Sequence, residues 1–168
     1  MKKTKKLTLL SIFTAAALVL SYIEMLLPPI YSAVPGVKIG LANIIIIFLI
    51  YKFSFKSAIA VSVVRVVLIS LMFGNAVILI YSLAGAVLSL CFMAILKKIN
   101  CFSVLGVSIV GAVTHNLGQV ITAIILMETV QIGYYMVVLS ISGTLAGIAV
   151  GIVSAYVLKY TANFKIQK

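Results

Sequence analysis

The sequence predicts an all-α integral membrane protein, a single bundle of six transmembrane helices, and three observations lead to this class. Hydrophobic residues make up 64% of the 168 residues, charged residues make up only 9%, and the mean hydropathy is +1.33. Ordinary globular chains carry about 25% charged residues, so a water-soluble domain of this composition would lack polar surface. Six apolar stretches of the chain, separated by short polar segments, are the candidate helices.

Each apolar stretch is bounded by residues that end a helix or belong outside the membrane. Pro28 and Pro29 follow the first stretch, Gly74 and Asn75 separate the third from the fourth, and a lysine pair ends the fourth. The second stretch has only 13 residues, so we expect a short helix there. The predicted helices span residues 7–27, 39–51, 55–73, 76–96, 103–127 and 134–158.

The lysines predict the orientation of the bundle. Apart from Lys38, every lysine precedes the first helix, follows the sixth, or lies between the second and third or the fourth and fifth. With six crossings these lysines share one side, which the positive-inside rule makes cytoplasmic. We therefore expect both termini in the cytoplasm, the chain in the plasma membrane, and the net charge of +11 facing anionic lipid rather than nucleic acid. Cleavage of the first helix as a signal peptide is the alternative, although the apolar run is longer than usual for one.

Polar side chains inside a membrane are costly, so their positions indicate where function lies. Those expected within the bundle fall from its centre to its outer half, and Lys38 lies in the outer loop. On the fifth helix His115 shares one face with Gly111 and Gly118, with Gln119 beside it. This distribution favours an outward-opening cavity that binds a ligand, whereas hydrogen bonds between helices are the alternative. The candidate binding residues are Glu24, Lys38, Asn43, Arg65, His115, Asn116 and Gln119.

Arg65 is the only arginine and lies at the middle of the third helix. A guanidinium group stays protonated, so it needs an acidic partner or polar acceptors. Either Glu24 pairs with Arg65, or an acidic group of a substrate does, and the sequence leaves both open. Arg65, His115 and Lys38 suggest an anionic group on the ligand, and the apolar surroundings suggest an aromatic or prenyl body.

Three glycines of the sixth helix point to close packing. Gly143, Gly147 and Gly151 are four residues apart and form a flat ridge on one helix face. We expect another helix to pack against this ridge, either from the same chain or from another subunit.

Several enzyme classes are excluded by residues that the sequence lacks. There is no phosphate loop of the form GxxxxGK[ST] and no aspartate, and only one histidine and two glutamates are present. ATP hydrolysis by a phosphate loop, magnesium-dependent diphosphate chemistry, zinc sites and catalytic triads therefore find no support. We expect no catalytic activity, no metal and no cofactor.

Two motifs resemble a bacterial membrane family. They are VPGVKIGLAN at residues 34–43 and GAVTHNLGQ at residues 111–119. The family they resemble is labelled "Gx transporter" or "heptaprenyl diphosphate synthase component I", and the likeness covers nearly the whole chain. This family in turn looks like the S components of energy-coupling-factor transporters, six-helix proteins that bind vitamins or related small molecules from outside.

The resemblance implies partners and a function. S components work with a transmembrane coupling subunit and two ATPase subunits, and many dock through two alanines four apart on the first helix. Here the matching residues are Ser11 and Ala15, or Ala17 and Ser21. We therefore expect a solute-binding subunit of a small-molecule importer. The alternative, implied by the second label, is a non-catalytic membrane subunit in polyprenyl diphosphate or quinone biosynthesis.

The predicted orientation can be tested by cysteine labelling in intact cells. A cysteine introduced at Ser32 or Thr129 should react with a membrane-impermeant thiol reagent, whereas one at Phe53 should not, because the lysine-rich loops face the cytoplasm. Labelling at Phe53 together with protection at Ser32 would contradict this orientation.

Overall fold

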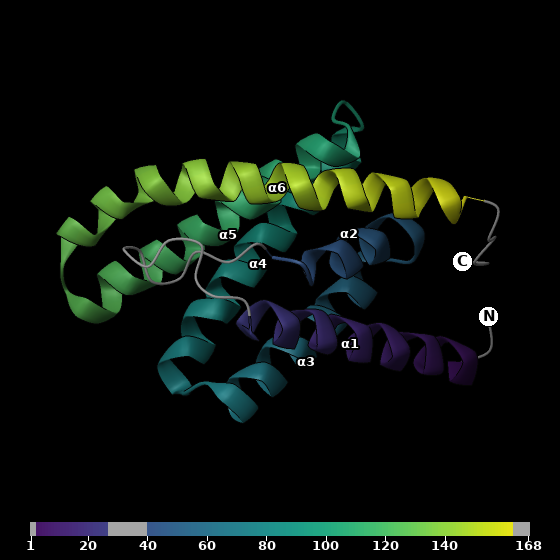
Figure 1. Cartoon of the computed structure of the whole chain (residues 1–168), viewed down its shortest axis with the longest axis horizontal. Helices are drawn as coiled ribbons and strands as arrows, with labels where there is room; N and C mark the ends of the chain where they lie inside the picture. Colours follow the sequence, from purple (N-terminus) through teal and green to yellow (C-terminus); the bar gives the residue numbers. More distant parts are fainter. Residues whose placement is uncertain (1–2, 27–39, 163–168) are drawn as a thin grey trace.

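The computed structural model describes residues 3–26 and 40–162, and in these ranges all regular secondary structure is helical (Figure 1). The all-α fold is therefore confirmed, and each expected helix end lies within four residues of the observed one. The elements are α1 (Lys3–Leu26), α2 (Asn43–Lys52), α3 (Phe55–Phe73), α4 (Ala76–Ile99), α5 (Val104–Met127), the 3-10 helix η1 (Val130–Tyr134) and α6 (Tyr135–Tyr160).

Short polar side chains divide the apolar sequence into helices. Ser54, Asn75 and Ser103 cap α3, α4 and α5, and each side-chain oxygen accepts a backbone N–H of the first turn, at 3.3, 2.9 and 3.2 Å respectively. Asn100 and Glu128 end α4 and α5 in the left-handed conformation, with φ of 59° and 50°. These residues fix where the chain reverses direction.

Five helical segments are long and apolar enough to cross a membrane: α1, α3, α4, α5, and η1 with α6. Their outward surfaces carry large apolar side chains, such as Leu71 and Ile125, which are 73% and 69% exposed. An apolar surface on several sides of a bundle fits a lipid environment, where helices satisfy their own backbone hydrogen bonds. The protein is therefore a multi-pass membrane protein.

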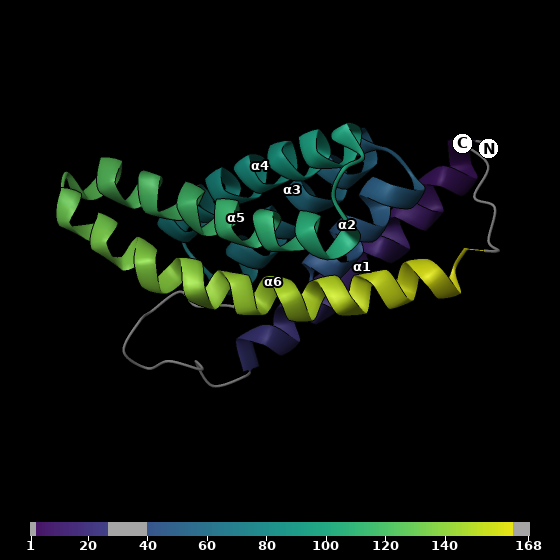
Figure 2. The ribbon, with the colours of Figure 1, turned by 90° about the horizontal axis from the view of Figure 1, so that it is seen from above.

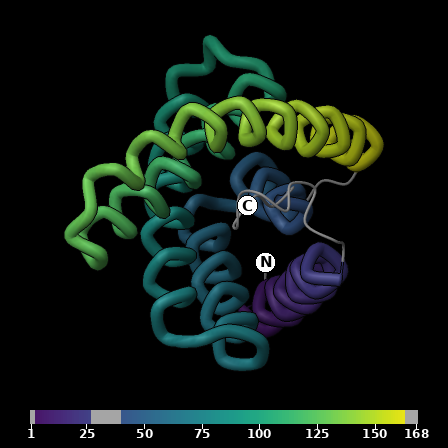
Figure 3. Tube along the Cα trace, turned by 60° about the vertical axis from the view of Figure 1, so that its left-hand side comes forward, coloured from purple at the N-terminus to yellow at the C-terminus, as the bar shows by residue number. Residues whose placement is uncertain are grey.

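The second helix is short, as predicted. Ten residues at about 1.5 Å per residue reach only about 15 Å, about half of the ~30 Å hydrocarbon core, so α2 is too short to cross the membrane by itself. Its residues 46–50 are nevertheless all buried, which places protein around every face of the helix. Figure 3 shows α2 between α1 and α6, and it contacts α1, α3 and α6.

The longer helices form an arc around α2. Contacts run from α1 to α3, then to α4, α5 and α6, and α2 fills the space between the two ends of this arc. The start of α1 and the end of α6 lie at the same end of the molecule, here called the terminal end (Figure 2). Lys97 of α4 donates to the carbonyl of Ile50, and Lys52 donates to the carbonyl of Thr161 at 2.8 Å. The last turns of α2, α4 and α6 therefore meet at the terminal end.

The glycine ridge of α6 packs against α5 of the same chain, which answers the question that the sequence left open. A Cβ atom built on Gly147 would lie 2.7 Å from the Cα of Ile109, and one on Gly151 would lie 3.0 Å from the Cα of Leu105. These backbones approach so closely that no larger residue fits without moving a helix.

The opposite side of α5 uses the same device against α4. A Cβ on Gly118 would lie 2.9 Å from the carbonyl oxygen of Ala84. Ser89 of α4 also donates to the carbonyl of Gly111 at 2.7 Å. Close contacts at glycines on both sides of α5 therefore pack α4, α5 and α6 tightly into one layer of three helices.

The packing of α6 on α5 predicts the effect of adding one methyl group. Gly147→Ala should lower the thermal midpoint, because overpacking against fixed backbone costs about 1–3 kcal/mol. Gly106→Ala is the matched control, since its Cβ would meet only ordinary contacts, the nearest at 3.5 Å. Thermal unfolding of both purified variants measures the difference, and equal midpoints would contradict the close contact.

Candidate functional site

A polar cavity lies inside the bundle and receives residues from all six α-helices. Its volume is about 100 Å³, enough for several water molecules or a small polar group. The lining comes from the later turns of α1 and α3 and the early turns of α4 and α6, so the cavity lies in the half of the bundle away from the terminal end. The first residue of α2, Asn43, also lines it, so the cavity is next to the point where the short helix begins.

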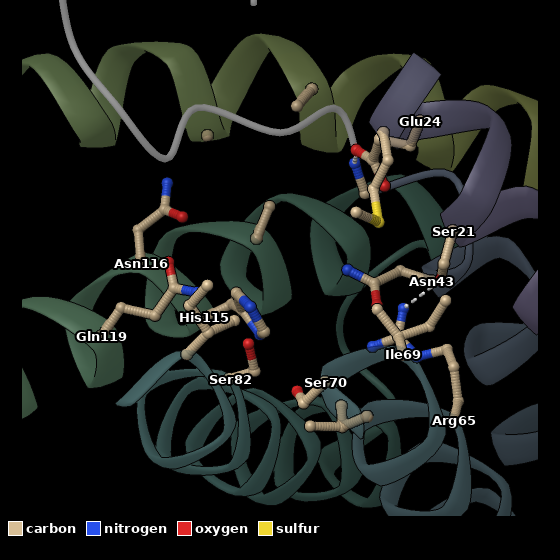
Figure 4. Close-up of a pocket in the computed structure, with 17 residues that line it drawn as sticks. Ser21, Glu24, Asn43, Arg65, Ile69, Ser70, Ser82, His115, Asn116 and Gln119 are labelled. Atoms are coloured by element: carbon tan, nitrogen blue, oxygen red, sulfur yellow. Dashed lines mark hydrogen bonds between the residues drawn. The ribbon is translucent and has the colours of Figure 1, made fainter. Parts of the chain in front are cut away.

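Six of the seven binding residues predicted from the sequence line this single cavity (Figure 4). They are Glu24, Asn43, Arg65, His115, Asn116 and Gln119. Lys38 lies outside the described residues. The fold thus brings together residues from four helices that lie between positions 24 and 119 of the sequence.

Arg65 reaches the cavity with its hydrogen-bonding capacity only partly used. Its Nη1 donates to the hydroxyl of Ser21 at 3.4 Å, a long hydrogen bond (Figure 4). Its Nε is buried, and no acceptor among the described residues contacts it. A buried charged donor without an acceptor is costly, so an acceptor from a bound molecule would stabilise this position.

Glu24 takes a different partner from the one considered from the sequence. Its Oε1 accepts the backbone N–H of Gly40, so the two hydrogen bonds of Glu24 and Arg65 go to separate neighbours and not to each other. Both charges nevertheless line the same cavity.

Gly40 shapes the start of α2. Its φ of 76° lies in the left-handed region, which favours glycine, and its carbonyl accepts the N–H of Asn43 at 2.8 Å. A Cβ on Gly40 would lie 3.1 Å from the side-chain nitrogen of Asn43. The turn therefore sets the position of Asn43. The backbone N–H of Gly40 donates to Glu24.

The three polar residues of α5 have different surroundings. Asn116 donates to the carbonyl of Leu139 on α6 at 2.8 Å, so its amide nitrogen forms the hydrogen bond between helices that was the alternative to ligand binding. His115 lies against α4, where a Cβ on Gly85 would be 2.7 Å from the carbonyl oxygen of His115. Gln119 extends toward the cavity from the next turn (Figure 4).

The structure adds hydroxyl groups that sequence reasoning did not assign to the site. Ser21, Ser70 and Ser82 line the cavity, and Ser21 and Ser70 are buried. Ser21 lies one turn before Glu24 on the same face of α1, a spacing that could have indicated it. Serines are common on packed membrane helices, so residue type alone does not separate them from packing residues.

The fold and the cavity define a multi-pass α-helical membrane protein with a polar interior cavity. The chain belongs to the family described as heptaprenyl diphosphate synthase component I, whose model matches residues 13–157. The recognition of this family from two sequence motifs is thereby confirmed, and the match includes every described residue of the cavity. Comparisons with curated proteins and with solved structures found no match.

The turn at Gly40 predicts a strong effect from a small substitution. Gly40→Ala should lower the thermal midpoint, because an L residue in the left-handed region costs about 1–2 kcal/mol and the new methyl group would press on Asn43. Gly133→Ala is the control, since Gly133 has no positive φ and its Cβ would make one ordinary contact at 3.7 Å. Equal midpoints for the two variants would show that the turn is not constrained as described.

Proposed function

We propose that this protein is the solute-binding subunit of a small-molecule importer in the plasma membrane, energised by separate ATPase subunits. It binds its solute in the polar cavity and performs no catalysis. The observation that carries the proposal is Arg65, which lines the polar cavity and whose buried Nε has no acceptor among the described residues. A ligand that supplies an acceptor would stabilise this arrangement, because the described residues leave the donor without one.

The composition of the cavity supports a ligand with polar and apolar parts. Arg65 offers a planar donor edge suited to a carboxylate, and the amides of Asn43 and Gln119 add neutral hydrogen-bonding groups (Figure 4). Apolar side chains such as Ile69 and Ile78 cover other parts of the wall. A compact organic solute with an acidic group fits this lining, as binding sites combine an apolar surface with a few polar groups.

Two features of α1 support docking on a coupling subunit. Of the two candidate pairs of small residues, Ala17 and Ser21 are buried, whereas Ser11 and Ala15 are exposed. Ser11 and Ala15 are four residues apart, so they share one helix face that a partner helix can approach closely. We therefore assign the docking surface to Ser11 and Ala15.

We infer the orientation of the bundle from the lysines. Placing the lysine-rich terminal end in the cytoplasm puts the cavity in the outer half of the membrane, because it lies away from the terminal end. A solute would then enter from outside the cell, as an importer requires.

A second candidate function is favoured by the family description, which names a component of a synthase. In that case the chain would serve as a non-catalytic membrane subunit beside a catalytic component that makes a polyprenyl diphosphate. The sequence has no aspartate for magnesium-dependent diphosphate chemistry, so catalysis would belong to the partner.

Purification from native membranes in mild detergent distinguishes the two functions. The importer subunit should co-purify with a membrane coupling protein, ATPases and a small solute, all identified by mass spectrometry. Deletion of the ATPases should abolish uptake of that solute. Co-purification of a prenyl synthase without any bound solute would contradict the proposal and favour the second function.

Variants of the cavity then separate binding from folding. His115→Ala and Gln119→Ala should each weaken binding of the co-purified solute by about 1–3 kcal/mol, roughly tenfold to a hundredfold. Their thermal midpoints should change little, because hydrogen bonds between membrane helices average only about 0.6 kcal/mol. Gln131→Ala, an amide exposed in η1, is the matched control and should bind normally. Unchanged affinity with lowered midpoints would make these residues structural.

A further inference from the structure

The formal charges of the cavity are balanced among its described lining residues. Arg65 contributes one positive charge and Glu24 one negative charge, while the other polar lining groups are hydroxyls, amides and the His115 imidazole. A ligand enters a space of low dielectric, where an uncompensated charge costs more than in water. The ligand class is therefore constrained by this balance as well as by shape.

Arg65 lines the cavity with a guanidinium group whose hydrogen bonds are only partly used. Ser21 uses only Nη1, and the buried Nε has no partner among the described residues. The edge of a guanidinium group that includes Nε donates two parallel N–H groups, which matches the two oxygens of a carboxylate. A single carboxylate therefore satisfies the donor that the protein leaves open.

Glu24 keeps capacity for a bound donor. Its Oε1 accepts the N–H of Gly40, but an ionised carboxylate has two oxygens with about four acceptor sites. The hydrogen bond from the Gly40 N–H holds Glu24 at the turn before α2, and the hydrogen bond to Ser21 holds Arg65. The two charged groups therefore do not pair directly with each other, and each can contact a ligand. A cationic nitrogen of a ligand would complete the negative side of the site.

We propose that the cavity selects a small zwitterion, whose carboxylate binds the guanidinium group of Arg65 and whose cationic nitrogen binds Glu24. This assignment rests on the proposed solute-binding function and names its substrate class. A neutral ligand would leave both protein charges unsatisfied, and a simple anion would leave Glu24 beside a second negative charge. A diphosphate is disfavoured most, because its several negative charges would face one arginine that Glu24 already balances.

The carbon skeleton of the zwitterion has a place beside these charges. Ile69, Ile78 and Ala146 line the cavity and supply an apolar wall from three helices. The cavity of about 100 Å³ is small, so the apolar part is a short chain rather than a ring or a long prenyl chain.

The test compares molecules that share a carbon skeleton and differ only in charge. Purified full-length protein in detergent is titrated with alanine, ethylamine and propionate, then with leucine, 3-methylbutylamine and 4-methylpentanoate, and with inorganic pyrophosphate. In at least one set the zwitterion should bind roughly tenfold or more tightly than both singly charged analogues, because each analogue loses one charged hydrogen bond. Pyrophosphate should bind more weakly than the zwitterion.

Variants link the preference to the two charges. Glu24→Gln keeps an acceptor for the Gly40 N–H but removes the negative charge, so it should shift the preference from the zwitterion to the acid of the same set. Glu128→Gln, the control, removes the only other acidic side chain, which is exposed at the end of α5, and should leave the preference unchanged. If Glu24→Gln fails to fold, the comparison within the wild-type protein still decides.

Several outcomes would overturn the assignment. They are an acid or pyrophosphate that binds the wild-type protein at least as tightly as the zwitterion, a preference that Glu24→Gln leaves unchanged, and the absence of binding in both sets. None of these outcomes removes the proposed solute-binding function, which depends on the co-purified solute and on ATPase-dependent uptake. If no solute co-purifies but the purified protein still prefers the zwitterion, the importer proposal fails and the assignment of the zwitterion site stands.

Discussion

The structure depends on how a half-length helix is buried in a membrane bundle. In hydrocarbon each unsatisfied backbone group costs several kcal/mol, and every helix end leaves N–H and C=O groups without partners inside the helix. The side chains of other helices satisfy groups at both ends of α2. Glu24 of α1 accepts an N–H in the turn before α2, and Lys97 of α4 donates to a carbonyl in its last turn. A cation near the last turn also interacts favourably with the helix dipole.

The cavity is a consequence of this short helix. Residues 46–50 of α2 fill the core of the half of the bundle nearer the terminal end, where they pack with Ala17, Val61 and Val107. In the other half α2 is absent, and the turn at Gly40 and the side chain of Asn43 border an open space. The same residues that satisfy the backbone of α2 therefore become the wall of the site. A change in the turn should affect stability and binding together.

The second condition for the site is the rigid packing of α4, α5 and α6. Glycines allow backbone contact on two sides of α5, where the Cβ of a larger residue would come within 3.0 Å of a neighbouring helix. The hydrogen bond from Asn116 to the carbonyl of Leu139 also joins α5 to α6. His115 and Gln119 lie in the contact with α4, where a Cβ on Gly85 would come within 2.7 Å of the His115 carbonyl oxygen and 3.1 Å of the Gln119 Cγ, so helix packing fixes this part of α5. Such pre-organisation lowers the cost of ordering side chains on binding.

Much of this protein follows from its sequence because the membrane restricts the possible structures. In hydrocarbon only structures that satisfy their own backbone can cross, so apolar length, prolines, lysines and the break at Gly74 and Asn75 were enough to predict six helices and their approximate ends. The cost of polar groups in lipid also predicted that Glu24, Asn43, Arg65, His115, Asn116 and Gln119 lie around one interior cavity, and these six residues line it. Family membership followed from two motifs and was confirmed by the family match.

The tertiary structure alone decided which partner each of these residues takes. Spacing along a helix gives the face of a residue but not the neighbouring helix, so the sequence left open whether Arg65 meets Glu24 and whether the ridge of α6 packs within the chain. The structure directs Arg65 to Ser21, Glu24 to Gly40, Asn116 to Leu139 and the glycine ridge to α5. Each of these contacts joins residues distant in the sequence, and such contacts form only when the helices choose their neighbours. The physical reason is that helix formation in a membrane is local, whereas helix packing depends on the fit of whole surfaces.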